Sequence, residues 1–261
     1  MKTTSVRARG IDRVIEVLEF FRATRQPTTI GDLARKLNAP RSTLYEIVNS
    51  LTEAGMLEQT DEQGRFYFGS AVYFYADAYL ASQPLVRKGR DEVMRLAELA
   101  GETAQLCMLL GNKYTVAHMQ AGSRLFRISS ETGVLVPIPW TASGRVLLGN
   151  MTREQVLAFI PPEDFRLPNG KTVPLDDFMN DIRMAHEQGY VITAALADEF
   201  TCCLAVPILD QTTNQPIATL CFVVPIHTPE ERRMELIGLL KTSSSIVSAR
   251  LGDGKIPATA R

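Results

Sequence analysis

Residues 38–55 read NAPRSTLYEIVNSLTEAG, and this stretch predicts one helix together with both of its ends. Pro40 is expected at the first helical position, because its missing N–H is not needed there and its φ is already helical. From Leu44 to Leu51, apolar side chains recur at the i, i+3, i+4 and i+7 spacing that places them on one buried face. Gly55 then ends the helix in a left-handed cap.

A second, shorter helix is predicted directly before it. Thr29 is a suitable N-cap, and apolar side chains from Ile30 to Leu37 follow with helical spacing. Asn38 supplies the tight turn between the two helices. Two helices joined in this way have the spacing of a helix-turn-helix, although an ordinary pair of packed helices has the same pattern. A further apolar stripe over residues 11–23 predicts a third helix that completes a small core.

A short hairpin is predicted after these helices. Residues 56–60 and 65–68 read as strands, and they flank the polar turn Asp61-Glu62-Gln63-Gly64. Helices followed by such a hairpin are typical of a winged helix-turn-helix, in which the wing reaches a phosphate or the minor groove beside the recognition helix. The hairpin therefore favours the DNA-binding interpretation over the ordinary helix pair.

The distribution of charge is compatible with this interpretation. The net charge of −1 over 261 residues provides no general attraction to nucleic acid, but Lys2, Arg7 and Arg9 precede the first predicted helix and further basic residues follow up to Arg41. We expect phosphate contacts from Arg41 and Arg65. The candidates for the major groove are Ser42, Thr43, Tyr45 and Asn49.

Length and composition exclude several classes of protein. The chain is long enough for two domains, and 45% hydrophobic with 22% charged residues is a globular composition. No apolar run approaches the roughly 20 residues of a membrane span, and no secretory leader follows the basic N-terminus, so a cytoplasmic location is expected. The four cysteines lack metal-finger spacing. We therefore expect free thiols, no metal and no cofactor.

The remainder of the chain predicts an α+β domain behind a linker helix. Residues 70–82 are rich in aromatic side chains, which would pack either on their own domain or on the same helix of a second subunit. A helix over residues 85–100, closed by Gly101, leads into a mainly antiparallel sheet with helices packed on it. Strands are predicted over 103–110, 114–120, 190–193, 203–209 and 217–224, helices over 143–149, 152–160, 176–188 and 230–250, and a surface loop over 161–174.

The stretch VPIPWTASGR, residues 136–145, is the second informative one. Two prolines prevent a helix from beginning earlier, and Thr141 is a suitable N-cap. The free N–H groups of Ala142 and Ser143 would then be exposed at a helix N-terminus, where a carboxylate or phosphate is favoured. An ordinary capped helix is the commoner meaning of such a pattern.

Three motifs in order resemble the IclR family of bacterial transcription regulators over almost the full length of the chain. They are Pro40-Arg-Ser-Thr-Leu with the wing Glu58…Gly64-Arg65-Phe66, Val136-Pro-Ile…Thr141-Ala…Gly144-Arg145, and Gly189-Tyr190 followed by Cys203-Leu-Ala-Val-Pro-Ile-Leu-Asp210. The resemblance implies a winged helix-turn-helix domain at 1–69, a linker helix at 70–83 and an effector-binding, GAF-like antiparallel sheet with flanking helices at 84–261. It also implies a homodimer or homotetramer that binds operator DNA and controls a catabolic operon. Repression is the commoner mode that the family implies, and activation is the alternative.

The resemblance also implies where a small molecule would bind. The family's pocket positions correspond here to Leu125, Ile128, Val136, Trp140, Cys203, Cys221 and Val223. Pro139 and Trp140 replace the His and small residue that are frequent in the family, and Thr193 stands where some members have an acidic residue. Glu46 likewise stands where a basic residue is common in the recognition helix.

These departures predict a pocket that is less polar than in members that bind very small acids. An apolar wall gains roughly 25 cal/mol for each Å² that a ligand shields from water. We therefore expect a small organic acid with an aromatic or otherwise apolar body. Its carboxylate would be bound by the N–H groups of Ala142 and Ser143, assisted by the hydroxyls of Ser143 and Thr193, because no Arg or Lys is evident inside.

Two other functional classes are weaker. Cys203 is the candidate nucleophile of an enzyme, but no histidine or carboxylate has a sequence relation that would activate it, and the three histidines are scattered. Adjacent cysteines at 202 and 203 cannot easily ligate one tetrahedral ion. A protein-interaction module would explain the aromatic linker but not the wing or the pocket. We therefore predict no catalytic residues.

Overall fold

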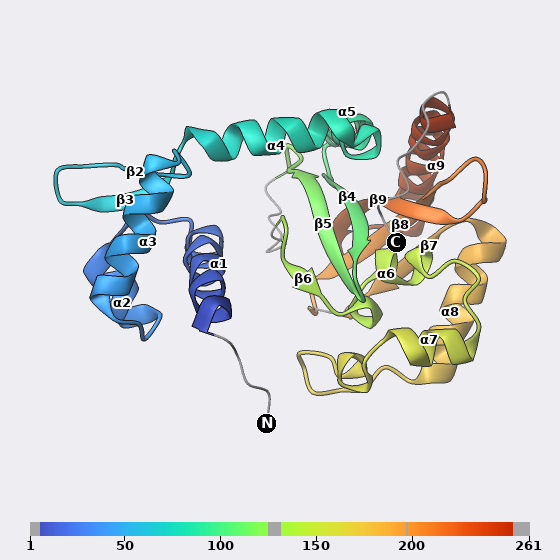
Figure 1. The fold of residues 1–261 in the computed structure, drawn as a ribbon. Helices are drawn as coiled ribbons and strands as arrows, with labels where there is room; N and C mark the ends of the chain where they lie inside the picture. The colour runs from blue at the N-terminus through green and yellow to red at the C-terminus, as the bar shows by residue number, and fades with distance from the viewer. Residues whose placement is uncertain (1–5, 125–131, 197, 253–261) are drawn as a thin grey trace. The chain divides into compact units, whose positions relative to one another are not determined.

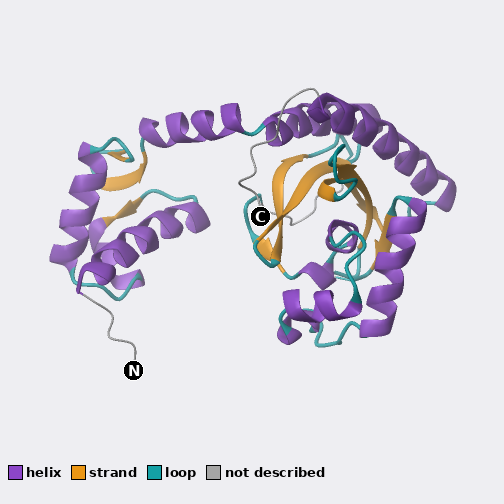
Figure 2. Cartoon of the chain, turned by 45° about the vertical axis from the view of Figure 1, so that its right-hand side comes forward, coloured by secondary structure: helices purple, strands orange, loops and turns teal. Residues whose placement is uncertain are grey.

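The computed structural model describes residues 6–124, 132–196 and 198–252. The chain divides into two compact units, residues 1–82 and 83–261, and each is described by itself (Figures 1 and 2). The sequence interpretation predicted a linker helix at residues 70–83 between domains at 1–69 and 84–261. Among the helices that the structure describes, none combines the length and the apolar character that a membrane span requires.

The first unit is a helical core with a small sheet. Its elements are α1 (Val6–Thr24), β1 (Thr28–Thr29), α2 (Ile30–Lys36), α3 (Arg41–Glu53), β2 (Leu57–Gln59), β3 (Arg65–Phe68) and α4 (Ser70–Ser82). Val17, Phe21, Leu33, Leu44 and Val48 pack together from α1, α2 and α3. The predicted stripes of the second and third helices face this core, but the stripe predicted for the first helix is wrong in part. Ile11 and Ile15 are 64% and 53% exposed, and Val17, which was not part of that stripe, is buried in their place.

Two local features differ from the prediction. Pro40 is the residue before α3 rather than its first helical residue, because its ψ of 132° is extended and Arg41 begins the helix. Strand β1 was not predicted, since two threonines give no periodic signal. It pairs with β3, opposing Thr28 to Phe66, and within the described residues the sheet has the order β1-β3-β2.

Helix α4 begins where Gly69 closes the wing. The N–H of Gly69 donates to Met56 O at 2.9 Å, and a Cβ at this glycine would lie 2.4 Å from Gly55 O, so no other residue fits without a shift of the backbone. None of the side chains of α4 is buried within the chain. Tyr73, Phe74 and Tyr75 are each more than 60% exposed.

The second unit is a curled sheet with helices on both faces (Figures 1 and 2). Its helices are α5 (Pro84–Ala100), η1 (Ile138–Trp140), α6 (Ala142–Leu147), α7 (Arg153–Phe159), η2 (Pro162–Phe165), α8 (Leu175–Gln188) and α9 (Glu230–Gly252). Its strands are β4 (Thr103–Leu110), β5 (Lys113–Gln120), β6 (Leu135–Val136), β7 (Val191–Ala194), β8 (Thr201–Leu209) and β9 (Pro216–Pro225).

Within the described residues these six strands form one sheet, in the order β6-β5-β4-β9-β8-β7, and neighbouring strands run antiparallel. Alternate side chains of the central strands enter two separate cores. One core lies under α5 and α9 and contains Cys202, Leu204 and Phe222, and the other lies under α6 and α8 and contains Cys107, Cys221 and Val223. The α+β class and the predicted order of the elements are confirmed.

The predicted surface loop at 161–174 is wrong in part. Phe165, Leu167 and Val173 are buried, and Arg166 forms an isolated bridge with Thr172. The ring of Phe165 meets that of Phe178 on α8 edge-on, with ring centroids 5.4 Å apart. The segment folds back because its apolar side chains complete the core under α8, which proline and glycine content does not indicate.

Candidate functional site

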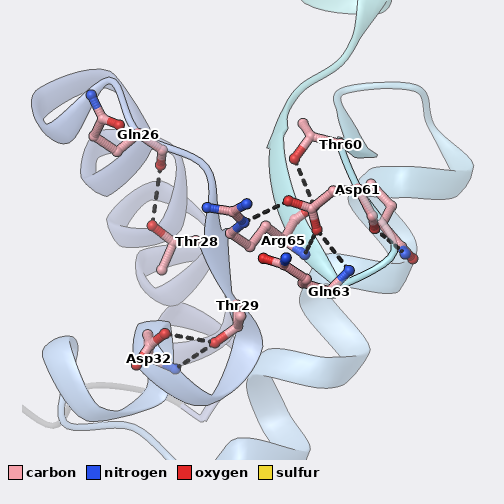
Figure 3. A network of polar contacts seen from close by, with 9 residues as sticks. Gln26, Thr28, Thr29, Asp32, Thr60, Asp61, Gln63 and Arg65 are labelled. Atoms are coloured by element: carbon pink, nitrogen blue, oxygen red, sulfur yellow. Dashed lines mark hydrogen bonds and ion pairs between the residues drawn. The ribbon is translucent and has the colours of Figure 1, made fainter.

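The first candidate site is the exposed surface of α2, α3 and the wing. Thr29 caps α2: its hydroxyl accepts from Asp32 N at 3.2 Å and donates to Asp32 Oδ2 at 2.8 Å (Figure 3). Asn38 takes a left-handed conformation, with φ of 47°, and turns the chain into α3. These two local devices set the angle at which α3 presents its polar face.

Three of the five predicted DNA-contacting residues of α3 are exposed. Arg41, Ser42 and Tyr45 are exposed, Tyr45 by 57%, whereas Thr43 and Asn49 are half-buried. Within the described part of the chain, the side chain of Arg41 makes no hydrogen bond or ion pair. Its guanidinium is therefore available to a ligand, while Leu44, Val48 and Leu51 anchor the opposite face of the helix.

Asp61 organises the wing (Figure 3). Its Oδ1 accepts from the N–H groups of Gln63 at 2.9 Å and Arg65 at 3.2 Å, and its Oδ2 accepts from Arg65 Nε at 2.5 Å. Desolvation raises the pKa of Asp61, but the hydrogen bonds from Arg65 and Gln63 outweigh it and hold the pKa below its ordinary value. Arg65 is exposed at the wing. The hydrogen bond from its Nε to Asp61 fixes the orientation of the guanidinium group.

The second candidate site is a cavity of about 340 Å³ between the sheet and the segment from η1 to α6. The register places Cys203 beside Val223, and Cys221 between Gln105 and Ala205. The cavity is lined by eight of the predicted residues, Val136, Trp140, Ala142, Ser143, Thr193, Cys203, Cys221 and Val223. Leu125 and Ile128 lie outside the described residues.

The start of α6 is held rigidly over the sheet. Thr141 caps it, because its hydroxyl accepts from Gly144 N at 2.9 Å. Arg145, only 2% exposed, donates through one terminal nitrogen to the carbonyls of Pro139 and Thr141, both at 2.9 Å, and through Nε to Asp181 at 2.7 Å. Burial lowers the pKa of Arg145 and the contact with Asp181 opposes this shift. The basic residue nearest the helix start therefore supports the backbone and does not line the cavity.

Trp140 forms one side of the cavity, and a hydrogen bond of its indole ring fixes its position. Its indole N–H donates to the carbonyl of Asp164 at 2.9 Å, and the carboxylate of Asp164 pairs with Lys113. The segment that was predicted as a surface loop therefore fixes a wall residue of the cavity.

The buried thiols of Cys107 and Cys221 are uncharged at neutral pH. Burial raises the pKa of Cys107 to about 11, and a contact with Cys203 together with burial raises the pKa of Cys221 well above its ordinary value. Tyr114 donates its hydroxyl to Cys107 Sγ at 3.1 Å. All four cysteines are free, and no group of three His, Cys, Asp or Glu side chains that suits a metal ion occurs among the described residues.

Sequence reasoning missed several lining residues, of which Gln105 and Asp198 matter most. Gln105 is 2% exposed, and among the residues the structure describes its amide has only sulfur partners, Met119 Sδ at 3.6 Å and Cys107 Sγ at 3.9 Å. A lone amide in an otherwise apolar strand was a usable signal. Asp198 follows β7 in a loop without a periodic pattern, so only the fold brings it to the cavity.

Comparison with known families matches residues 10–61 to the IclR helix-turn-helix domain and residues 77–249 to the bacterial transcriptional regulator IclR C-terminal domain. The chain is 22% identical over 246 residues to the HTH-type transcriptional repressor AllR of Salmonella typhimurium, covering 94% of this chain and 90% of that protein. It is 24% identical over 247 residues to the HTH-type transcriptional regulator KdgR of Escherichia coli, covering 93% and 94%.

The fold is similar to the crystal structure of an IclR homolog from Microbacterium hydrocarbonoxydans complexed with 4-hydroxybenzoate. The TM-score is 0.79 at 22% identity, and the alignment covers 94% of this chain and 100% of that one.

Proposed function

The chain belongs to the IclR family of bacterial transcription regulators, and on that premise we propose that it is a repressor whose cavity binds a small organic acid with an apolar or aromatic body. The observation that carries this proposal is the cavity itself. Its wall is mainly apolar, yet it includes the start of α6, where the N–H groups of Ala142 and Ser143 have no helical partner.

The volume and the wall suit one substituted ring. An engineered apolar cavity of about 150 Å³ binds benzene, so about 340 Å³ leaves room for a ring with substituents. Trp140, Val136 and Val223 offer apolar surface, and the neutral thiol of Cys221 adds surface without charge. The 4-hydroxybenzoate complex of the Microbacterium relative supports this class of ligand.

In this proposal, α3 reads a nearly two-fold symmetric operator and the acid controls its occupancy. A single winged domain buries too little surface for typical operator affinity, so two half-sites are read together by a homo-oligomer. The acid shifts the population between DNA-competent and incompetent oligomers, which requires different affinities for the two states. Named repressors among the relatives support repression. No catalytic step is part of the proposal.

A thermal-shift screen of the full chain tests the ligand class. We expect aromatic carboxylates to raise the midpoint of the second unit more than short polar acids do, because only the former cover the apolar wall. Val223→Asp should weaken every aromatic acid, since it places a second carboxylate in the cavity. The exposed loop variant Thr212→Asp is the control and should behave like the parent.

Release of a labelled operator by the same acids then connects binding to regulation. Greater stabilisation by short polar acids, or a Val223→Asp variant that responds like the parent, would contradict the apolar-pocket interpretation. Acids that stabilise the protein but leave the operator bound would contradict their role as effectors.

A further inference from the structure

The cavity has two polar ends of different chemistry, separated along β8. Cys221 lies opposite Ala205, and four residues earlier on β8 stands Thr201, opposite Pro225. At about 3.3 Å per residue, this separation is roughly 13 Å. Ser143 and Gln105 lie by the row of Cys221, whereas Asp198 and Thr201 lie at the other end, and all four line the cavity.

The first end has hydrogen-bonding groups without strong partners. Ser143 is 1% exposed, and its hydroxyl makes no hydrogen bond that meets ordinary geometry with any residue the structure describes. The amide of Gln105 is bonded only to sulfur atoms, which are weak partners. Together with the free N–H groups of α6, these groups can donate to a carboxylate.

The second end can only accept. Asp198 is the one charged side chain among the described residues that line the cavity. Its Oδ1 accepts from Phe200 N at 2.8 Å and its Oδ2 accepts from the Thr201 hydroxyl at 2.7 Å. A carboxylate offers about four acceptor sites, so two remain. Because the hydroxyl of Thr201 is already donating to Asp198, both side chains require a donor from the ligand.

We propose that Asp198 selects effectors that carry a hydrogen-bond donor, a hydroxyl or an amino group, at the end of the body opposite the carboxylate. This inference rests on the proposed acid effector and adds its second functional group. After about 3 Å is allowed for each hydrogen bond, the ends leave roughly 7 Å, the span of one ring with opposed substituents. A ligand without the donor leaves the two remaining acceptor sites of Asp198 without a partner, which is a basis for rejection.

The test measures calorimetric dissociation constants of three acids of similar size on the full chain. The probes are 4-hydroxybenzoate, 4-aminobenzoate and 4-methylbenzoate, of which only the last lacks a donor. We expect the parent to bind the two donors about tenfold or more tightly than the methyl compound. Asp198→Asn should reduce that preference to within about threefold while 4-methylbenzoate keeps its affinity within about twofold.

Two further variants separate recognition from folding. Asp210→Asn is the matched control, because Asp210 also accepts from backbone N–H groups of its own loop but does not line the cavity. It should keep the parent's preference. Thr201→Val removes the hydroxyl beside Asp198 and should lower the preference severalfold, which provides a second readout if Asp198→Asn unfolds.

The outcomes distinguish this inference from the proposed function. Equal affinity of the parent for all three acids overturns the role of Asp198 and leaves the acid effector standing. An equal loss of all three acids in Asp198→Asn assigns that residue a structural role and also overturns the inference. Failure of the parent to bind any of the acids contradicts the proposed acid effector, and the inference falls with it.

Discussion

Two aspartates, one in each unit, perform the same local task. Asp61 in the wing and Asp198 after β7 each accept a backbone N–H of their own loop and hold a neighbouring side chain, Arg65 and Thr201 respectively. Such Asx-type contacts replace the backbone hydrogen bonds that a loop lacks. At both sites a functional candidate is therefore oriented by a residue three or four positions away in the chain.

Arg41 and Asn49 should have separable roles on DNA. Arg41→Ala should weaken binding about equally on all sequences and reduce the salt slope by about one, because it removes a phosphate contact. Asn49→Ala should relax the preference at one base position. Fluorescence anisotropy on a selected operator and a scrambled duplex, over a series of salt concentrations, measures both effects.

Arg166→Ala is the control for Arg41, since Arg166 is also exposed but lies in the other unit. Its binding should equal that of the parent. If Arg41→Ala and Asn49→Ala both bind the operator like the parent at matched salt, α3 is not the recognition helix.

His118 should make the second unit sensitive to mild acid. Burial, with the charge of Arg90, lowers the pKa of His118, while Asp91 opposes the shift. Below the unfolded pKa of about 6.5, the unfolded chain binds a proton that the folded chain resists, so stability is lost as the pH falls. Urea unfolding at about pH 7.5 and about pH 5.5 should show a larger loss for the parent than for His118→Gln. An equal loss of stability in the parent and in His118→Gln would show that His118 is not the cause of the acid sensitivity.

At the scale of the elements, the segment from η1 to α6 requires glycine at position 144. A Cβ at Gly144 would lie 2.1 Å from the carbonyl oxygen of Ile138, so any larger residue moves η1 away from α6. Arg145 fixes the same segment through the carbonyls of Pro139 and Thr141. The position of the cavity wall is therefore set by backbone contacts.

Gly144→Ala should destabilise the second unit by about 1–3 kcal/mol and weaken acid binding, because the shift displaces the N–H groups of Ala142 and Ser143. Chemical denaturation and calorimetry measure the two effects. Gly238→Ala on α9 is the matched control, since nothing lies within 4 Å of its added Cβ. That variant should be as stable as the parent or slightly more stable, because alanine favours a helix. Parent-like acid binding by Gly144→Ala would contradict this account.

For the whole molecule, the exposed aromatic side chains of α4 predict self-association. None of its side chains is buried within the chain, and Tyr75 and Tyr79 are 61% and 52% exposed. Exposed apolar clusters of this kind mark interaction surfaces. We propose that α4 contributes to a homodimer or homotetramer.

Sedimentation at micromolar concentration should therefore show an oligomer. The double variant Tyr75→Ser, Tyr79→Ser should shift the equilibrium towards smaller species and weaken operator binding, because two half-sites are no longer linked. Leu157→Ser, at a 51% exposed position on α7, is the control. A parent that sediments as a monomer would refute the prediction.

The sequence alone determined the longer helices and strands and their order, because helical and strand periodicities, caps and turn residues are local signals, but it did not indicate the short elements β1, β6, η1 and η2. The apolar stripe of α3, the cap at Thr29 and the turn at Asn38 are all formed as the pattern indicated. The alternation of residues in β8 also placed Cys202 and Cys203 on opposite faces. The predicted start of α3 at Pro40 was wrong by one residue. The fixed φ of proline suits the residue before a helix as well as its first residue.

Only the tertiary structure decided which side chains share the cavity. Gln105, Asp198 and Thr201 come from β4, a loop and β8, and the pairing of β4 and β8 with β9 brings them together. The burial of Phe165 within residues 161–174 was settled in the same way, by the fit of its ring against Phe178. Strand register and core packing join residues that are far apart in the chain, and no local pattern of residues encodes those contacts.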